Sequence, residues 1–191
     1  MDLPRCGQCL SLASAFAHCI AGADYAAPWD RLITAFKFQR QVELAGALSQ
    51  VLERAVRASA LHAEPARWPA LLLPVPLSRE RLRERGYNQA WELARRLARR
   101  LRIDATPAVL QRSRDTAHQI GMTRQQREHN LRDAFWVDPT ARVKLQGRPV
   151  ALVDDVLTTG ATAHAAALAL TRAGATSVDV WVVARTPLAE P

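Results

Sequence analysis

The segment Val150–Thr162 constrains the fold of this 191-residue chain more than any other part of its sequence. A run of apolar residues ends in two adjacent carboxylates, Asp154 and Asp155. Two residues later the sequence Thr-Thr-Gly-Ala-Thr, at 158–162, opens an alanine-rich stretch that Gly174 closes in the manner of a helix C′ residue. This order predicts a buried parallel strand, a tight turn and a helix, which is a repeating unit of α/β folds.

Apolar periodicity predicts the other helices and strands. Residues 32–56 carry apolar side chains at helical spacing, which predicts one or two helices with a break near residues 38–41. The same spacing recurs in residues 89–102, where Asn88 is the expected N-cap. Short apolar runs predict strands over residues 71–76, 108–110, 134–137, 148–154 and 177–184. Strands that alternate with helices predict an α/β fold with a mainly parallel central sheet flanked by helices.

The polar groups of the segment at 150–162 suit a sugar phosphate. Ligands of parallel sheets bind at the carboxyl ends of strands, where Asp154 and Asp155 are expected. Carboxylates accept hydrogen bonds from vicinal ribose hydroxyls, and N–H groups at a helix N-terminus bind phosphate. Gly160 lets the backbone approach that phosphate closely. The alternative is a strand that ends in an acidic N-cap before a threonine-rich helix.

Arginine dominates the formal net charge of +8 and gathers in residues 79–102 and 112–132. Two explanations stay open: attraction to polyanions such as nucleic acid or pyrophosphate, and an arginine-rich composition spread over a solvated surface. Residues 111–132 lack a clear period and are interpreted as a long functional loop. Lys37, between two phenylalanines, is interpreted as a structural lysine whose stem packs on the protein while its ammonium reaches water.

The first 24 residues are interpreted as a degenerate zinc-ribbon-like segment, and residues 25–191 as the main domain. Cys6 and Cys9 have the spacing of half a zinc site, and Cys19 is a candidate third ligand. Gly22 stands where a fourth cysteine is expected, so zinc binding and a metal-free knuckle both stay open. The chain shows no signal-peptide pattern and no apolar run of bilayer length. We therefore expect a cytoplasmic protein with no membrane insertion.

The segment at 150–162 resembles the thirteen-residue motif with which type I phosphoribosyltransferases bind 5-phosphoribosyl-1-pyrophosphate (PRPP). Several other stretches are similar to the competence protein F (ComF) family of phosphoribosyltransferase-like proteins. They are residues 73–77, 81–89, 112–116 with Gln119, and Arg127 with Asn130. The resemblance covers roughly residues 25–187 and implies a type I phosphoribosyltransferase-like fold. The family typically begins with a cysteine-rich zinc ribbon, of which this chain keeps three cysteines.

The resemblance also implies a set of PRPP-binding residues. Asp154 and Asp155 would contact the ribose hydroxyls, and Thr158, Thr159, Gly160, Ala161 and Thr162 would wrap the 5-phosphate. The pyrophosphate would be bound after the first core strand and by the loop at 112–132. The residues expected to bind it are Val75, Pro76, Arg85, Arg112 and Arg114. PRPP would bring Mg²⁺, whose charge offsets that of the pyrophosphate.

Three functions remain open from sequence. The first is an enzyme that transfers the phosphoribosyl group to a nucleobase or ammonia with release of pyrophosphate, although no catalytic residue can be named. The second is a non-catalytic module that binds PRPP or a nucleotide. The third is a role in competence and DNA uptake, in which the basic clusters would bind single-stranded DNA, although no row of aromatic side chains accompanies them.

Overall fold

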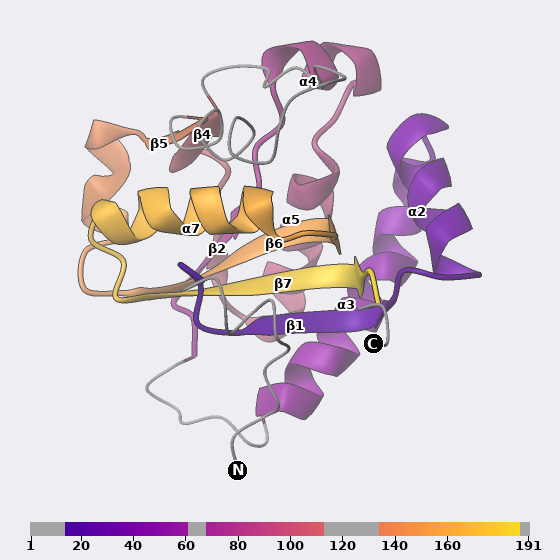
Figure 1. Ribbon diagram of the computed structural model, residues 1–191, viewed down its shortest axis with the longest axis horizontal. Coiled ribbons are helices and arrows are strands. Elements are labelled where there is room, and N and C mark those ends of the chain that lie inside the picture. The colour runs from indigo at the N-terminus through magenta and orange to yellow at the C-terminus, as the bar shows by residue number, and fades with distance from the viewer. Residues whose placement is uncertain (1–13, 61–67, 113–133, 188–191) are drawn as a thin grey trace.

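A five-stranded, all-parallel sheet lies at the centre of the computed structural model, whose described residues are 14–60, 68–112 and 134–187 (Figure 1). Its strand order is β1 (Cys19–Asp24), β7 (Ser177–Arg185), β6 (Pro149–Leu157), β2 (Leu71–Pro74) and β3 (Asp104–Ala105). The mainly parallel sheet predicted from sequence is confirmed. The predicted strands at 71–76 and 177–184 correspond closely to β2 and β7.

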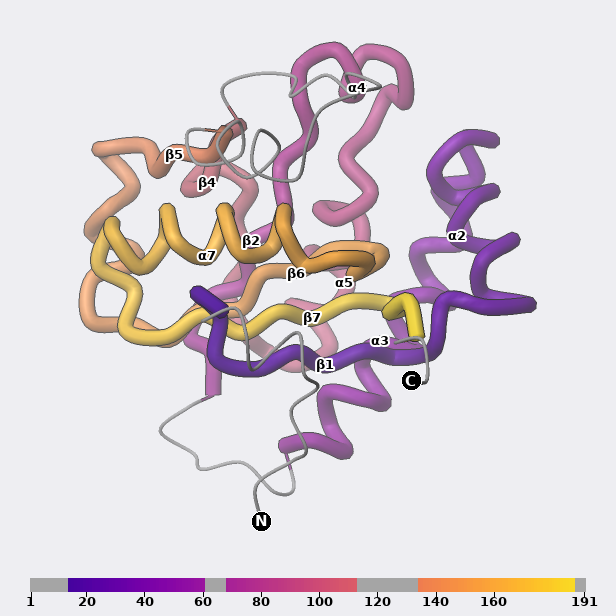
Figure 2. Tube along the Cα trace, in the orientation of Figure 1, coloured from indigo at the N-terminus to yellow at the C-terminus, as the bar shows by residue number. Residues whose placement is uncertain are grey.

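Helices cover both faces of this sheet (Figure 2). One face packs against α2 (Trp29–Phe38), α3 (Ala45–Ala60) and α5 (Gln89–Leu101), and a short 3-10 turn, η1 (Val42–Leu44), separates α2 from α3. The other face packs against α7 (Ala161–Arg172) and a two-stranded antiparallel ribbon of β4 (Leu110–Arg112) and β5 (Phe135–Val137). The 3-10 helix η3 (Pro139–Lys144) follows β5. No helix in these residues is long and apolar enough to cross a bilayer.

Strand β6 runs through the middle of the core and is buried on both faces. Val150 and Leu152 contribute to the core under α7, whereas Ala151 and Val153 contribute to the core under α2, α3 and α5. Successive strand residues point to opposite faces, so a strand covered on both sides needs apolar residues at every position. This explains why the run before the two aspartates lacks any alternation.

The expected helix caps are present. The side chain of Asn88 accepts a hydrogen bond from the N–H of Trp91 at 3.2 Å and begins α5, as predicted. Gly174 follows α7 with a φ of 110°, which glycine adopts without strain.

Helix α4 (Arg79–Arg85) lies in the first arginine-rich stretch and was not predicted from sequence. The Ser78 side chain accepts a hydrogen bond from the N–H of Arg81, and Gly86 ends the helix with a φ of 82°. None of the residues of α4 is buried. The helix therefore lacks the stripe of apolar residues by which packed helices are recognised in a sequence. The helix stands beyond the carboxyl end of β2, above the sheet (Figure 1).

The last quarter of the cysteine segment belongs to the sheet. Residues 19–24 form the edge strand β1, in which Cys19 pairs with Val180 of β7. A β-carbon on Gly22 would lie 2.9 Å from the Cγ1 of Val51 and 3.0 Å from the carbonyl oxygen of Val183. Helix α3 approaches the strand so closely there that a cysteine would not fit unless its neighbours moved. Close packing therefore accounts for glycine at the position where sequence analysis expected a fourth metal ligand.

Candidate functional site

The two aspartates lie inside strand β6. The sequence predicted that the strand would end at Asp154, but it continues to Leu157 because β7 runs alongside it as far as Arg185. On its other side, β2 stops at Pro74, opposite Val153. Asp154 and Asp155 therefore extend past the end of one neighbouring strand, at the carboxyl edge of the sheet.

Asp155 is a buried carboxylate with one partner. Its side chain lies 2.8 Å from the ammonium of Lys37 on α2, and the residue is 3% exposed. The other carboxylate oxygen, Oδ2, is buried and has no hydrogen-bond partner in the described part of the chain. Such an oxygen is costly to leave unbonded. The interpretation of Lys37 as a lysine whose ammonium reaches water was wrong, because the ammonium turns inward to the Asp155 carboxylate.

Asp154 forms an acidic cluster with Asp155 and Lys37, and its carboxyl group is hard to ionise. Burial, followed by repulsion from Asp155, raises the pKa of Asp154 from 3.8 to about 7. The charges of Lys37 and Arg85 and a 2.8 Å hydrogen bond from the N–H of Asp155 act in the opposite direction. The cluster thus holds one carboxylate paired with lysine and one that titrates near neutral pH.

Helix α2 is fixed against this cluster by its last turn. The hydroxyl of Tyr87 donates to the carbonyl of Phe36, and the two rings lie 5.7 Å apart between centroids. The Arg85 guanidinium lies 4.9 Å from the centroid of the Phe38 ring. Burial lowers the pKa of Arg85, while the charge of Asp155 raises it. These contacts, before and after Lys37 in sequence, hold the lysine toward Asp155.

The turn after β6 offers donors to a phosphate. Thr158 and Thr159 are exposed, and Gly160 has a φ of 77° at the N-cap of α7. No side chain caps that helix, although the Thr159 hydroxyl accepts a 3.4 Å hydrogen bond from the N–H of Ala161. The first N–H groups of a helix have no partner within it and attract anions. The predicted 5-phosphate residues therefore stand together at one helix N-terminus, next to the two aspartates.

The residues predicted to bind pyrophosphate are not gathered in one place. Val75 is buried and its N–H donates to the Val153 carbonyl at 2.9 Å, while Pro76 has no N–H. Arg112 lies in β4, with its guanidinium 5.4 Å from the Phe135 ring centroid, in the layer that packs with α7. Arg85 lies on the opposite side, against α2. Arg114 falls outside the described residues.

The metal ligands proposed from sequence can be placed only in part. Cys19 lies in β1, whereas Cys6 and Cys9 fall outside the described residues. Within the described ranges, no three histidine, cysteine, aspartate or glutamate side chains gather in a way that could hold a metal ion. Zinc binding stays a prediction.

Comparison with known proteins identifies the family of the chain. The phosphoribosyl transferase domain family matches residues 88–190. The DNA utilization protein YhgH of Escherichia coli strain K12 is 37% identical over 184 residues, which cover 95% of this chain and 78% of that protein. Competence protein F of Haemophilus influenzae is 35% identical over 181 residues, with the same coverage of both chains. The chain belongs to the competence protein F family of phosphoribosyltransferase-domain proteins.

Two solved structures are similar to part of this ComF-family chain. Glutamine phosphoribosylpyrophosphate amidotransferase from B. subtilis, complexed with ADP and GMP, is 22% identical, with a TM-score of 0.46 over 72% of this chain and 25% of that one. An allosteric regulatory enzyme of purine biosynthesis gives 21% identity and a TM-score of 0.45, over 73% and 26% of the two chains. The type I phosphoribosyltransferase fold rests on the domain match and the observed sheet.

Sequence reasoning missed the part of this ComF-family site that α2 supplies. Lys37 contacts Asp155, Phe38 stacks with Arg85, and Tyr87 bonds to the backbone of α2. The only signal was a lysine between two phenylalanines at the end of a predicted helix. A lysine in that setting fits a surface role equally well until the partner strand is placed.

Proposed function

We propose that this protein binds PRPP in the cytoplasm, with the ribose on Asp154 and Asp155 and the 5-phosphate at residues 158–162. The observation that carries the proposal is the unpartnered Oδ2 of Asp155, a buried acceptor beside an uncapped helix N-terminus. A ribose hydroxyl would satisfy that oxygen, and the 5-phosphate would meet the first N–H groups of α7. Sugar and phosphate sites one turn apart fit a ribose 5-phosphate unit.

We further propose that the bound PRPP reacts. The bond between C1 and the pyrophosphate breaks, a nitrogen of a nucleobase or ammonia forms the new bond to C1, and the nitrogen loses a proton. Mg²⁺ would be carried by the pyrophosphate oxygens and would offset their charge. The aspartates hold the ribose by its hydroxyls and take no part in bond breaking.

Calorimetry with PRPP and Mg²⁺ on the wild type and on the Asp154→Ala/Asp155→Ala double variant tests the binding proposal. We expect at least about a hundredfold weaker binding in the double variant, because two charge-assisted hydrogen bonds are lost. Equal affinity in the two proteins would contradict it. Pyrophosphate release in the presence of candidate bases or ammonia then separates an enzyme from a non-catalytic module.

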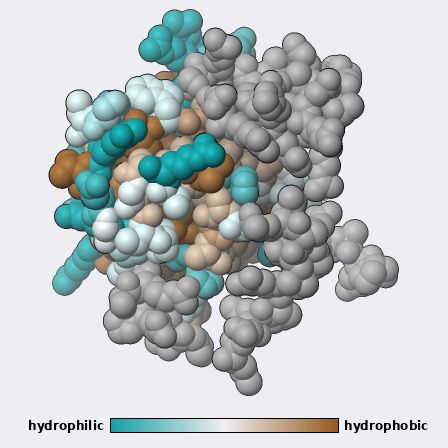
Figure 3. Space-filling view, turned by 60° about the vertical axis from the view of Figure 1, so that its left-hand side comes forward, coloured by the Kyte–Doolittle hydropathy of each residue, from teal (hydrophilic) through white to brown (hydrophobic). Residues whose placement is uncertain are grey.

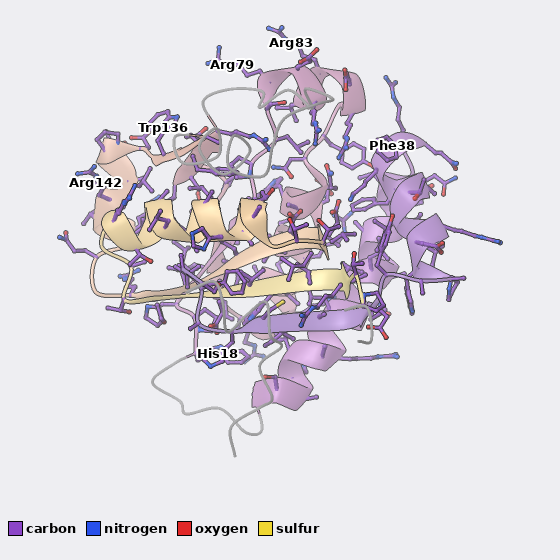
Figure 4. All side chains as sticks on the ribbon, in the orientation of Figure 1. His18, Phe38, Arg79, Arg83, Trp136 and Arg142 are labelled. Atoms are coloured by element: carbon purple, nitrogen blue, oxygen red, sulfur yellow. The ribbon has the colours of Figure 1, made fainter. Side chains whose placement is uncertain are left out.

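Single-stranded DNA is a second candidate ligand, and one exposed aromatic side chain favours it. Trp136 on β5 is 45% exposed and lies at the same end of the molecule as Arg142 (Figure 4). Figure 3 brings that end of the molecule forward and shows apolar and strongly hydrophilic side chains side by side on its surface. Bases stack on exposed aromatic rings, and arginines bind the phosphates between them. The relatives named for DNA utilization and competence agree with this candidate.

Replacing Trp136 by alanine tests this second candidate. We expect binding of a single-stranded oligonucleotide at low salt to weaken about tenfold, the effect of losing one stacked base. Fluorescence anisotropy measures it, and Val143→Ala, a change at another exposed apolar residue, is the control. An unchanged affinity in Trp136→Ala would remove Trp136 from the DNA site.

A further inference from the structure

Residues 14–17 precede strand β1 and lie between the sheet and α7, where Figure 1 draws them in indigo. The N–H of Ala17 donates to the carbonyl of Val178 on β7 at 2.8 Å. The N–H of Ala15 donates to Nδ1 of His164 on α7 at 3.2 Å. These four residues, named here the N-terminal strap, are therefore attached both to the sheet and to the first turns of α7.

His164 connects the strap to the turn at which the 5-phosphate is proposed to bind. Its imidazole accepts the hydrogen bond from Ala15, which requires an Nδ1 that carries no proton. Its own backbone N–H donates to the carbonyl of Gly160 at 2.8 Å and closes the first turn of α7. A single residue thus contacts the strap through its side chain and the phosphate turn through its backbone.

The ring of Phe16, in the middle of the strap, lies against the same turn. A β-carbon on Gly160 would lie 4.0 Å from Cζ of Phe16 and 4.0 Å from Cδ1 of Leu157. Phe16 is half-buried and packs against the apolar core under α7, to which Leu157 belongs. The turn is therefore supported by its own strand and by a segment far away in the sequence.

This support matters because the turn has little else to hold it. Gly160 has a φ of 77°, and glycine has more conformational freedom to lose than any other residue. Thr158 and Thr159 are exposed, and no side chain caps α7. Ordering such a turn around a phosphate costs conformational entropy, and packing that orders the turn beforehand reduces this cost. The Phe16 ring supplies packing of this kind.

We propose that the N-terminal strap positions the phosphate turn, with Phe16 and His164 as positioning residues that act through Gly160. This inference rests on the proposed function, because it takes a phosphate to bind at residues 158–162. Phosphate bound there stabilises the attached strap, and by linkage the attached strap strengthens phosphate binding by the same factor. The amino-terminal segment of the chain is thereby coupled to ligand binding at the far end of the sequence.

Calorimetry with ribose 5-phosphate on full-length variants tests the positioning role. We expect Phe16→Ala and His164→Ala to weaken binding about fivefold or more, the lower range of coupling between sites. Phe16→Leu keeps apolar packing against Gly160, and His164→Asn keeps an acceptor close to the place of Nδ1, so both should bind within about twofold of the wild type. His18→Ala is the matched control, because that imidazole bonds to Asp179 at 3.1 Å on the side of β1 away from α7 (Figure 4).

Hydrogen exchange gives a readout that a general loss of stability would not change. The N–H groups of Ala15 and Ala17 are hydrogen-bonded in the attached strap. Saturating ribose 5-phosphate should therefore slow their exchange about fivefold or more in the wild type, and should leave it unchanged in Phe16→Ala. Urea unfolding followed by circular dichroism establishes that each variant is folded.

The outcomes separate this inference from the proposed function. If ribose 5-phosphate binding requires the aspartates but is equally strong in Phe16→Ala and His164→Ala, the strap does not position the site and the proposed function stands. Unchanged exchange at Ala15 overturns the coupling in the same way, as does an equal loss of affinity in the conservative and the alanine variants. If ribose 5-phosphate does not bind, or binds without the aspartates, the proposed function fails and the inference fails with it.

Discussion

Replacing Lys37 by methionine is expected to lower the free energy of unfolding by about 3–5 kcal/mol at pH 7, the usual effect of removing one partner of a buried ion pair. The Asp155 carboxylate is 3% exposed, and the Lys37 ammonium at 2.8 Å is its only ion-pair partner among the described residues. Without the lysine, the buried charge would have to be neutralised by protonation or exposed by movement of α2. Urea unfolding followed by circular dichroism measures the change.

A second substitution shows whether the ion pair is the cause. Asp155→Asn on the Lys37→Met background removes the uncompensated charge, so the double variant should recover most of the lost stability. Removing both partners of a buried polar pair is often close to neutral. If Lys37→Met unfolds within about 1 kcal/mol of the wild type, the ion pair does not compensate a buried charge. If the double variant is no more stable than Lys37→Met, the loss comes from packing of the lysine stem.

The second prediction concerns pH. Raising the pH is expected to lower the stability of the fold and to strengthen the binding of ribose 5-phosphate. The pKa of Asp154 is about 7 in the folded protein and 3.8 ordinarily, so between these values the folded state binds a proton that the unfolded state does not. This contribution to stability is fully present below pH 3.8 and is lost as the pH rises through about 7. As this contribution is lost between pH 3.8 and about 7, the free energy of unfolding falls by up to about 1.4 kcal/mol per pH unit.

Binding of ribose should strengthen over the same window. An ionised Asp154 accepts hydrogen bonds from ribose hydroxyls better than the protonated acid does, so we expect affinity for ribose 5-phosphate to rise about tenfold up to pH 7 and then to level off. Calorimetry across pH 5–8 measures the affinity, and thermal unfolding measures stability.

Asp154→Asn is the control for both measurements. The variant binds the same phosphate group, so the ratio of its affinity to that of the wild type isolates the carboxylate from titration of the ligand. Its stability should lack the fall between pH 4 and 7. If affinity and stability depend on pH in the same way in the wild type and in Asp154→Asn, Asp154 ionises normally in the folded protein.

The sequence predicted the parts of this fold whose signals are local. The apolar run of β6, the Asn88 cap of α5 and the glycine after α7 each mark an element by residues within a few positions of one another. The two aspartates and the turn at 158–162 could be placed together for the same reason. Their position at the edge of the sheet then followed from the parallel architecture.

The parts that sequence missed depend on residues far apart in the chain. Strand β1 has only half-buried or exposed residues and no alternation, and it becomes a strand because β7 pairs with it. Lys37 acquires its role from Asp155, more than a hundred positions away. A small pocket lies between the end of α2 and α4 and is lined by Lys37, Phe38, Arg40, Glu84 and Arg85. Helix α4 itself lacks the apolar stripe that marks a packed helix. No pattern within either segment encodes these contacts.

The pairing of β1 with β7 has a consequence for how the protein is synthesised. Among the strands that the structure describes, β1 is synthesised before all others, and its only neighbour in the sheet is β7, which is synthesised after all others (Figure 1). Contacts between distant parts of a chain close slowly and late in folding. The place of β1 beside β7 therefore does not exist until β7 has been synthesised, and chains cut short before residue 177 would leave β1 without this partner.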